Sequence, residues 1–279
     1  EPPGVAFASR YAKALVCNDF LRNTPVTSGV RIETWTQPPQ TTVPPLDRSR
    51  IYIALALSDG DNQNVWRRYH RRYFEHPAHG RFPLAFGMGP PIVDIQPAVA
   101  QWYFEHAAPN TEFFADVSGI GYIRPEVYGE AYTAPDAALD GFLDWTRQYL
   151  EILDMRTLRT VRGNDALLKR YIRRLPGLHS LFADMGCYSG YSGIDELTYS
   201  LSGTPVFRAA TTWRRGAEGF LPELRAQVGD KRPAFVNGFV HCWTFDNLDK
   251  IVSLVENSDP DMVFVTPAQL AALYRQAHR

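Results

Sequence analysis

From residue 50 onward, short apolar runs alternate with segments of helical periodicity, and this alternation constrains the fold more than any other feature of the sequence. Eight runs have the length and residue types of strands: residues 51–57, 82–86, 112–117, 157–161, 178–183, 205–210, 234–240 and 262–265. Helices are expected at residues 136–154, 164–174, 220–228 and 248–256, and a capping box of Thr266 and Gln269 opens a terminal helix. Strands that alternate with helices predict a largely parallel sheet.

The first of these runs, residues 51–57, is apolar without interruption, as expected of a parallel strand that is covered on both faces. About eight strand-helix units favour an α/β fold of the (β/α) barrel type over an open sheet, either TIM-like or distorted with seven to eight strands. We therefore expect a barrel catalytic domain at residues 50–279. Residues 1–49, which include a proline-rich stretch, are expected to form a short N-terminal extension that packs on the barrel or leads into it.

Composition excludes several classes of protein. The chain has 29 basic and 30 acidic side chains and a formal net charge of -1, so it lacks the overall charge of a nucleic-acid binder. No apolar run reaches the roughly 18 residues that a membrane span needs. The three cysteines are widely spaced and indicate neither a disulfide framework nor a zinc site. Aromatic residues make up 13% of the chain, which suits surfaces that stack on sugar rings.

The sequence Ser58-Asp59-Gly60-Asp61-Asn62 directly follows the first buried strand. In parallel α/β folds the carboxyl ends of the strands build the active site, so these side chains are placed to face a ligand. In an extended continuation Asp59 and Asp61 point the same way, and their like charges would raise one pKa. Such a pair supplies an acid with a base or nucleophile, or else holds a metal. The alternative is that the five residues only form a turn.

A third carboxylate, Asp184, follows the expected strand at residues 178–183. The loop after it is rich in glycine, serine and tyrosine and contains Tyr188, as the rim of a sugar site requires. We predict that Asp184 opposes Asp59 and Asp61 across one cleft. Their separation would then select retaining hydrolysis at about 5 Å or inverting hydrolysis at about 6.5 to 9.5 Å.

Two more segments carry residues suited to sugar binding. Residues 118–125 combine two glycines with Tyr122 and Arg124, and residues 237–243 end in His241 and Trp243. We expect Tyr122, Tyr188 and Trp243 to stack on sugar rings, and Asn62, Arg124 and His241 to contact the substrate through polar atoms. The alternatives are a glycine turn for the first segment and a structural histidine for the second.

His76 and His79 lie three residues apart, but Pro77 between them disfavours the helix that would bring them onto one face. Together with Asp59 and Asp61 they would be the metal ligands under the alternative hypothesis of a metal-dependent enzyme. The leading expectation is that the protein uses no metal and no cofactor. The arginines at positions 67, 68, 71 and 72 are most simply a solvated helix face.

These same residues resemble the GxGYxYP family of putative glycoside hydrolases. The resemblance is carried by residues 58–62, by His76-Pro77 with Gly80, and above all by the sequence GIGYIRP at residues 119–125. It extends to residues 184–190, 204–206 and 263–267, and covers roughly residues 10–275. Arg124 stands where the family motif has a tyrosine, so substrate preference is expected to differ. There is a fainter similarity to polysaccharide deacetylase barrels.

The resemblance implies a bacterial, exported protein that acts on carbohydrate. Our leading hypothesis is a glycoside hydrolase that cleaves an oligo- or polysaccharide with the carboxylates of Asp59, Asp61 and Asp184. The alternatives are a metal-dependent polysaccharide deacetylase that uses His76 and His79, and a carbohydrate-binding protein without catalytic activity. Neither nucleic acid nor a membrane is expected as a partner.

Overall fold

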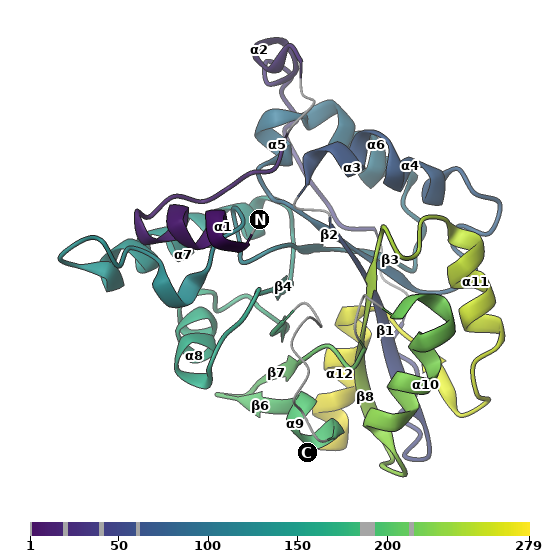
Figure 1. Cartoon of the computed structure of the whole chain (residues 1–279). Helices are drawn as coiled ribbons and strands as arrows, with labels where there is room; N and C mark the ends of the chain where they lie inside the picture. Colours follow the sequence, from purple (N-terminus) through teal and green to yellow (C-terminus); the bar gives the residue numbers. More distant parts are fainter. Residues whose placement is uncertain (1, 19–21, 39–41, 60–61, 185–192, 212–214) are drawn as a thin grey trace.

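A computed structural model describes residues 2–18, 22–38, 42–59, 62–184, 193–211 and 215–279. The fold is mixed α/β, with one largely parallel sheet and helices around it (Figure 1). The strands are β1 (Ile51–Ser58), β2 (Leu84–Met88), β3 (Thr111–Ala115), β4 (Thr157–Arg159), β5 (Ser180–Phe182), β6 (Thr198–Leu201), β7 (Thr204–Phe207), β8 (Ala234–His241) and β9 (Met262–Phe264). All eight expected runs overlap one of these strands.

The helices before β4 are α1 (Pro2–Arg10), α2 (Thr24–Thr27), α3 (Gln63–Arg67), α4 (Tyr69–Phe74), α5 (Ile92–Ile95), α6 (Pro97–His106) and α7 (Pro135–Ile152). Those after it are α8 (Asp165–Arg174), α9 (Ile194–Leu197), α10 (Gly216–Val228), α11 (Leu248–Glu256) and α12 (Pro267–Ala277). The five expected helices correspond to α7, α8, α10, α11 and α12. The predicted capping box opens α12, because Thr266 and Gln269 each accept the other's backbone N–H. No helix in the described ranges is long and apolar enough to cross a bilayer.

The strand order is β6-β7-β5-β4-β3-β2-β1-β8, and β9 pairs with β1. Strand β1 pairs with β8 along its whole length, from Ile51 opposite Ala234 to Ser58 opposite His241. Its other edge pairs first with β9 and then with β2. Every residue of β1 is buried, in agreement with the expectation for a central parallel strand.

The sheet is not closed, so the predicted TIM-like barrel is not confirmed. The reason is a hairpin that was not expected: β6 runs antiparallel to β7, and the two strands are joined at Ser202 and Gly203, which both have positive φ. Since β6 covers one edge of β7 and β5 the other, that strand has no edge left to pair with β8. Within the described ranges, one isolated bridge between Ala209 and Asn237 connects these two ends of the sheet.

The two faces of β1 belong to different layers of the core. Ile51, Ile53, Leu55 and Leu57 lie in the larger apolar cluster together with side chains of the surrounding helices. Tyr52, Ala54 and Ala56 point to the inner side, where phenylalanines of neighbouring strands pack with Leu270, Leu273 and Tyr274 of α12. The inner side of the sheet is therefore filled by α12 and aromatic rings toward its amino end.

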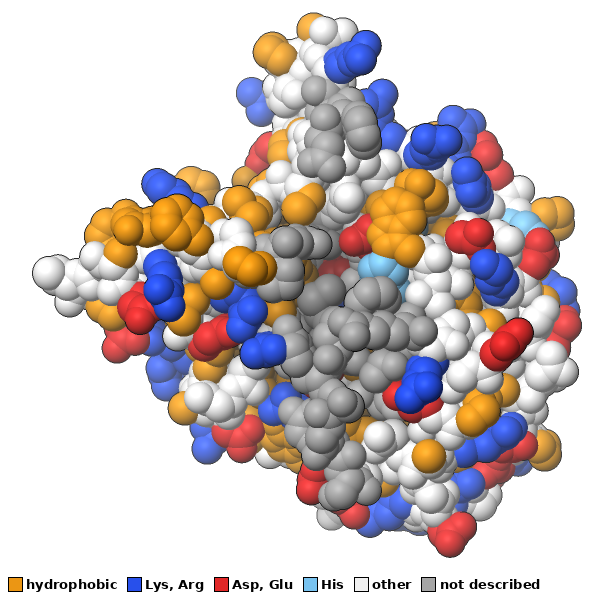
Figure 2. Space-filling model, viewed as in Figure 1, with side chains coloured by type: hydrophobic (Ala, Val, Ile, Leu, Met, Phe, Trp, Pro, Cys, Tyr) orange, Lys and Arg blue, Asp and Glu red, His pale blue; other side chains and the backbone are white. Residues whose placement is uncertain are grey.

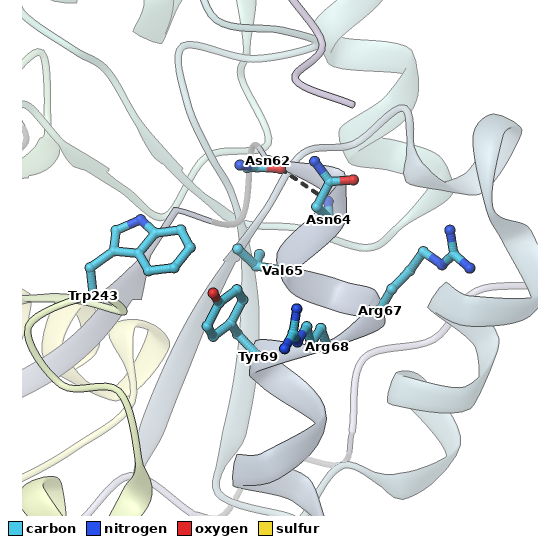
Figure 3. Close-up of a pocket in the computed structure, with 7 residues that line it drawn as sticks. All are labelled: Asn62, Asn64, Val65, Arg67, Arg68, Tyr69 and Trp243. Carbon is cyan, nitrogen blue, oxygen red and sulfur yellow. Dashed lines mark hydrogen bonds between the residues drawn. The ribbon is translucent and has the colours of Figure 1, made fainter. Parts of the chain in front are cut away.

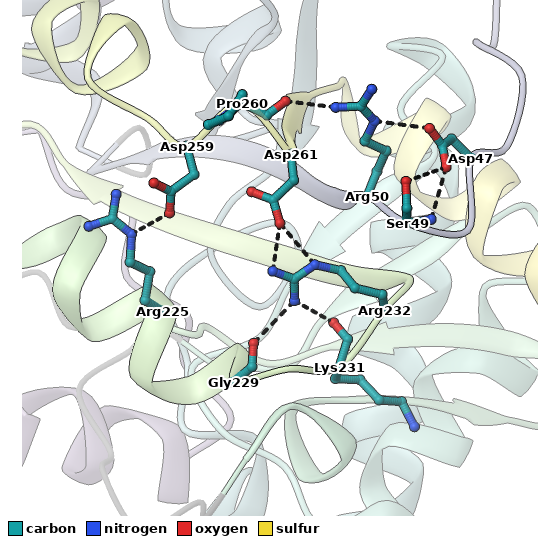
Figure 4. A network of polar contacts seen from close by, with 10 residues as sticks. All are labelled: Asp47, Ser49, Arg50, Arg225, Gly229, Lys231, Arg232, Asp259, Pro260 and Asp261. Carbon is teal, nitrogen blue, oxygen red and sulfur yellow. Dashed lines mark hydrogen bonds and ion pairs between the residues drawn. The ribbon is translucent and has the colours of Figure 1, made fainter.

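At the amino ends of β1, β8 and β9, partly exposed arginine and aspartate side chains pair with each other (Figure 4). Arg232 donates two hydrogen bonds to Asp261 at 2.9 and 2.6 Å, and Arg225 pairs with Asp259 at 2.6 Å. Arg50 donates to Asp47 at 3.0 Å. We call these three ion pairs the amino-edge network.

The N-terminal residues lie against the rest of the fold. Leu15 and Tyr122 form an antiparallel bridge with N–H to O distances of 3.0 and 2.8 Å, and Cys17 bridges Asn62. Further along, the side-chain amide of Gln37 pairs with both backbone groups of Phe113 in β3, at 3.0 and 3.1 Å. These contacts join the leading segment to the rest of the fold, while the division into an N-terminal extension and a separate domain from residue 50 stays a prediction.

Candidate active site

Aspartates follow three alternate strands of the sheet, β1, β3 and β5, at its carboxyl edge. Asp59 comes directly after β1, Asp116 directly after β3, and Asp184 two residues after β5. Parallel strands bring such residues to one edge, where α/β proteins bind their ligands. Asp59 and Asp184 were predicted, whereas Asp116 was not. The predicted Asp61 and Tyr188 lie outside the described residues.

Asp116 forms the buried centre of this edge together with Arg159 from β4. Both side chains are fully buried, and Nη1 of Arg159 lies 3.4 Å from Oδ2 of Asp116. Ser58 at the end of β1 donates a hydrogen bond of 2.9 Å to the same oxygen. The guanidinium also lies between two rings, 4.8 Å from the centre of Phe114 and 4.6 Å from that of Phe239. We call Ser58, Asp116 and Arg159 the buried triad.

Burial raises the pKa of Asp116, while the charge of Arg159 and the hydrogen bond from Ser58 act against that rise. The other carboxyl oxygen, Oδ1, is buried and makes no hydrogen bond within the described part of the chain. Gly87 in β2 makes room for this carboxyl, because a Cβ at that position would lie 2.3 Å from Oδ2. A buried aspartate with one oxygen unbonded is typical of functional sites.

Asp59 lies between the buried triad and the surface. Its backbone adopts a φ of 79°, which is uncommon for a residue with a side chain, and its carboxylate is partly exposed. The thiol of Cys242 donates to Oδ2 of Asp59 at 3.5 Å, and the backbone N–H of Asn62 donates to its carbonyl at 3.1 Å. The side chain of Asn62 caps α3 by accepting the N–H of Asn64 at 3.0 Å. Turn and capping interactions thus exist here, and they fix Asp59 in place.

A pocket of about 460 Å³ opens at Asn62, the residue whose backbone N–H donates to Asp59 (Figure 3). It is lined by Asn62, Asn64, Val65, Arg67, Arg68, Tyr69 and Trp243. Trp243 is 50% exposed and meets Tyr69 edge to face, with the ring centres 4.5 Å apart. An exposed indole beside amide groups is suited to a sugar ring and its hydroxyls. The sequence predicted Asn62 and Trp243 here, but not Tyr69.

His241 ends β8 opposite Ser58 and therefore lies beside the buried triad. Burial, and to a lesser extent the charge of Arg159, lower the pKa of His241 to about 4. The ring is therefore neutral at neutral pH. Its Nδ1 accepts the backbone N–H of Trp243 at 3.3 Å, so Nε2 carries the proton and acts as a donor.

Asp184 is only 3% exposed and is held by two neighbours. Its Oδ1 accepts the backbone N–H of Ala209 at 3.0 Å, and its Oδ2 lies 3.8 Å from Nη1 of Arg208. The carboxylate therefore has a fixed orientation at the end of β5.

Tyr122 and Arg124 lie against the N-terminal segment. Tyr122 is 8% exposed and packs with Val5, Val117 and Val161, while Arg124 pairs with Glu126 at 2.7 Å. The glycines of the motif fit close contacts: a Cβ at Gly121 would lie 2.9 Å from Cβ of Ala14, and one at Gly119, where φ is 127°, would lie 2.4 Å from Oγ1 of Thr146. This position favours a packing role over the predicted sugar contacts.

The two histidines of the metal-dependent alternative have different partners in the fold. His79 approaches Thr111, the first residue of β3, at 3.3 Å, and His76 pairs with Asp249 at 2.9 Å. His79 therefore lies at the amino end of β3, while Asp59 lies at the carboxyl end of β1. Residues 77–80 form a turn, in agreement with the expectation that Pro77 disfavours a helix there, while the alternative ligand set stays a prediction because Asp61 lies outside the described residues. No group of three potential metal ligands occurs within the residues that the structure describes.

Comparison with known proteins places this arrangement in a family. A family model, described as the GxGYxYP putative glycoside hydrolase C-terminal domain, matches residues 49–275. The crystal structure of a putative hydrolase from Bacteroides thetaiotaomicron VPI-5482 has a TM-score of 0.81 at 23% identity, over 98% of this chain and 54% of that one. The chain thus spans about half the length of that protein.

A putative polysaccharide deacetylase from Mycobacterium smegmatis is similar in fold, with a TM-score of 0.53 at 11% identity over 88% of this chain and 96% of that one. None of the curated proteins compared with the chain matches it. At these identities the two solved structures establish the fold, while the family model identifies the relatives. Because that model matches most of the sequence, the chain belongs to the GxGYxYP family of putative glycoside hydrolases.

Proposed function

We propose that this chain is the catalytic part of an enzyme that hydrolyses glycosidic bonds in an oligo- or polysaccharide. The single observation that carries the proposal is that the pocket of Trp243 and Tyr69 is also lined by Asn62, which is hydrogen-bonded to Asp59 at the carboxyl edge of a parallel sheet. Membership of the family supports the same reaction class. As the resemblance implies, we also propose that the protein acts outside the bacterial cytoplasm.

The proposed chemistry divides the carboxylates into two roles. One of Asp59 and Asp61 protonates the leaving oxygen, and Asp184 attacks the anomeric carbon or activates a water from the opposite side. His241, being neutral, donates a hydrogen bond from Nε2 to a substrate hydroxyl. Asp116 and Arg159 are fully buried, so they position Ser58 and thereby the turn that carries Asp59.

The test is the release of reducing ends from a panel of polysaccharides and aryl glycosides. Asp59→Asn, Asp61→Asn and Asp184→Asn should each lower the rate on the best substrate by about 10²- to 10⁴-fold. The matched control is Asp195→Asn, which removes a carboxylate that is 81% exposed and pairs with Lys231 on the surface. Its rate should equal that of the parent. Activity within a few-fold of the parent in all three site variants would refute the proposed roles.

A further inference from the structure

The wall of the pocket at Asn62 combines an aromatic surface with positive charge. Arg67 and Arg68 contribute to the lining, and none of the described lining residues is acidic. The chain as a whole has a net charge of -1 and offers no general attraction to an anion. Any preference for a charged ligand in this pocket must therefore arise from these local side chains.

Arg68 is the arginine best placed to meet a ligand. It lies between α3 and α4, and its guanidinium carbon is 6.0 Å from the ring centre of Tyr69. In Figure 3, Arg68 lies beside Tyr69, whereas Arg67 extends away from Trp243. No ion pair with Arg68 occurs among the described residues, in contrast to Arg71, which pairs with Glu75 at 2.6 Å.

The chemistry of these side chains identifies a class of ligand. A guanidinium binds a carboxylate through two parallel hydrogen bonds, while an amide or hydroxyl binds it less strongly. Trp243, at 50% exposure, offers a face for the apolar side of a sugar ring, and Asn62 and Asn64 offer amide groups for its hydroxyls. These groups together match a sugar that carries a carboxylate.

We propose that this pocket binds a uronic acid residue of the substrate, with the carboxylate on Arg68 and the ring on Trp243. The proposal rests on the proposed function, because it takes the pocket as part of the glycan site. It also assigns a role to Arg68, which the sequence alone suggests is part of a solvated helix face.

The experiment compares three matched pairs of probes by calorimetry: oligomers of galacturonate, glucuronate and mannuronate, each as the free acid and as the methyl ester. In low salt, at least one acid should bind about ten-fold more tightly than its ester. Arg68→Gln should abolish this difference and leave the affinity for the ester within about two-fold. Arg147→Gln, which removes an exposed arginine from α7, is the matched control and should leave the difference intact. Trp243→Ala should weaken both probes.

The outcomes separate the two proposals. If no acid binds better than its ester, or if Arg68→Gln leaves the preference intact, the uronic acid proposal is wrong even where a neutral glycan is hydrolysed. If an acid binds through Arg68 but no glycan or aryl glycoside is cleaved, this proposal stands and the hydrolase assignment fails. Raising the salt concentration should reduce the advantage of the acid, because the arginine is exposed to solvent.

Discussion

The two ends of the sheet use the same pair of residue types in opposite ways. At the amino edge, Arg232 and Asp261 are 28% and 34% exposed, and the pair lies among other exposed ion pairs (Figure 4). At the carboxyl edge, Arg159 and Asp116 are both fully buried. An exposed pair contributes little to stability, whereas a buried pair carries a large desolvation cost that hydrogen bonds and ring contacts must offset. The pair with the large desolvation cost, Arg159 and Asp116, lies at the same edge as the other aspartates of the candidate site.

The inner face of β1 explains how the buried pair fits. Ala54 and Ala56 are small, and Nη2 of Arg159 reaches the carbonyl of Ala56 at 3.4 Å. Further toward the amino end, Tyr52 stacks on Phe235 and fills the same side of the sheet. Small side chains near the carboxyl end of a strand therefore create room for a polar centre, and large ones near the amino end close the core.

Breaking the buried pair should have the largest effect on stability. Asp116→Ala removes the buried carboxyl group that pairs with the guanidinium of Arg159, which costs about 3–5 kcal/mol of unfolding free energy. A fall in Tm of about 10 °C is expected for a chain of this size. Thermal unfolding followed by circular dichroism measures the change. A fall of less than about 2 °C would mean that the buried triad is not held by this interaction.

Near the amino end of β3, the side chain of Glu112 is buried without an arginine partner among the described residues, so it differs from both ion pairs. Burial raises the pKa of Glu112 to about 7 from an ordinary value of 4.5, although the N–H of Ala268 at the start of α12 opposes the rise. Between these two pH values Glu112 binds a proton in the folded protein but not in the unfolded chain, so its contribution to stability is complete below pH 4.5 and is lost as the pH rises through 7. The loss attributable to Glu112 is about 3 kcal/mol.

Urea unfolding of the parent and of Glu112→Gln at several pH values measures this loss. The variant should lose less stability than the parent between pH 5 and 8. Glu105→Gln, on the exposed side of α6, is the control and should keep the slope of the parent. Equal slopes in all three proteins would show that Glu112 ionises normally.

Breaking an exposed pair at the amino edge should cost far less. Asp261→Ala removes the partner of Arg232, and the expected loss is about 1 kcal/mol or less, because solvent screens both groups. The same urea experiment, run beside Asp116→Ala, gives both values under one condition. Similar losses in the two variants would contradict the distinction between the two edges.

The smallest effect is expected at the family motif. Arg124→Tyr restores the motif's tyrosine, but the side chain lies against Glu126 and its backbone N–H bonds to Ser9 of α1. Glycan affinity should therefore stay within about two-fold of the parent, as measured by calorimetry with the best-bound probe. A ten-fold change in affinity would assign this segment to the binding site after all.

Much of the fold could be predicted because strands and helices repeat with a clear period. The hairpin of β6 and β7 was missed, since residues 198–201 are only partly buried and lack a continuous apolar run. The arginines at positions 67, 68, 71 and 72 were interpreted as one helix face, but the segment forms two short helices, α3 and α4, separated at Arg68, whose backbone is not helical. Whether a sheet closes depends on pairing between strands that are distant in the sequence, and the local periodicity of apolar residues does not predict such pairing.

Part of the site could be predicted from position alone, because Asp59 and Asp184 follow apolar strands. Asp116 and Arg159 were missed for a physical reason: the expected strands at residues 112–117 and 157–161 include them, so both seemed interior to a strand. The position of Tyr122 depends on where the N-terminal segment packs, and no local pattern contains that information.

A crystal structure of the protein soaked with the glycan pool that it hydrolyses tests the central claim most directly. We expect an ordered sugar at the carboxyl edge, with one ring on Trp243 and the glycosidic oxygen within about 3 Å of a carboxyl oxygen of Asp59 or Asp61. A sugar bound elsewhere, such as beside the amino-edge network, with that pocket empty, would contradict it.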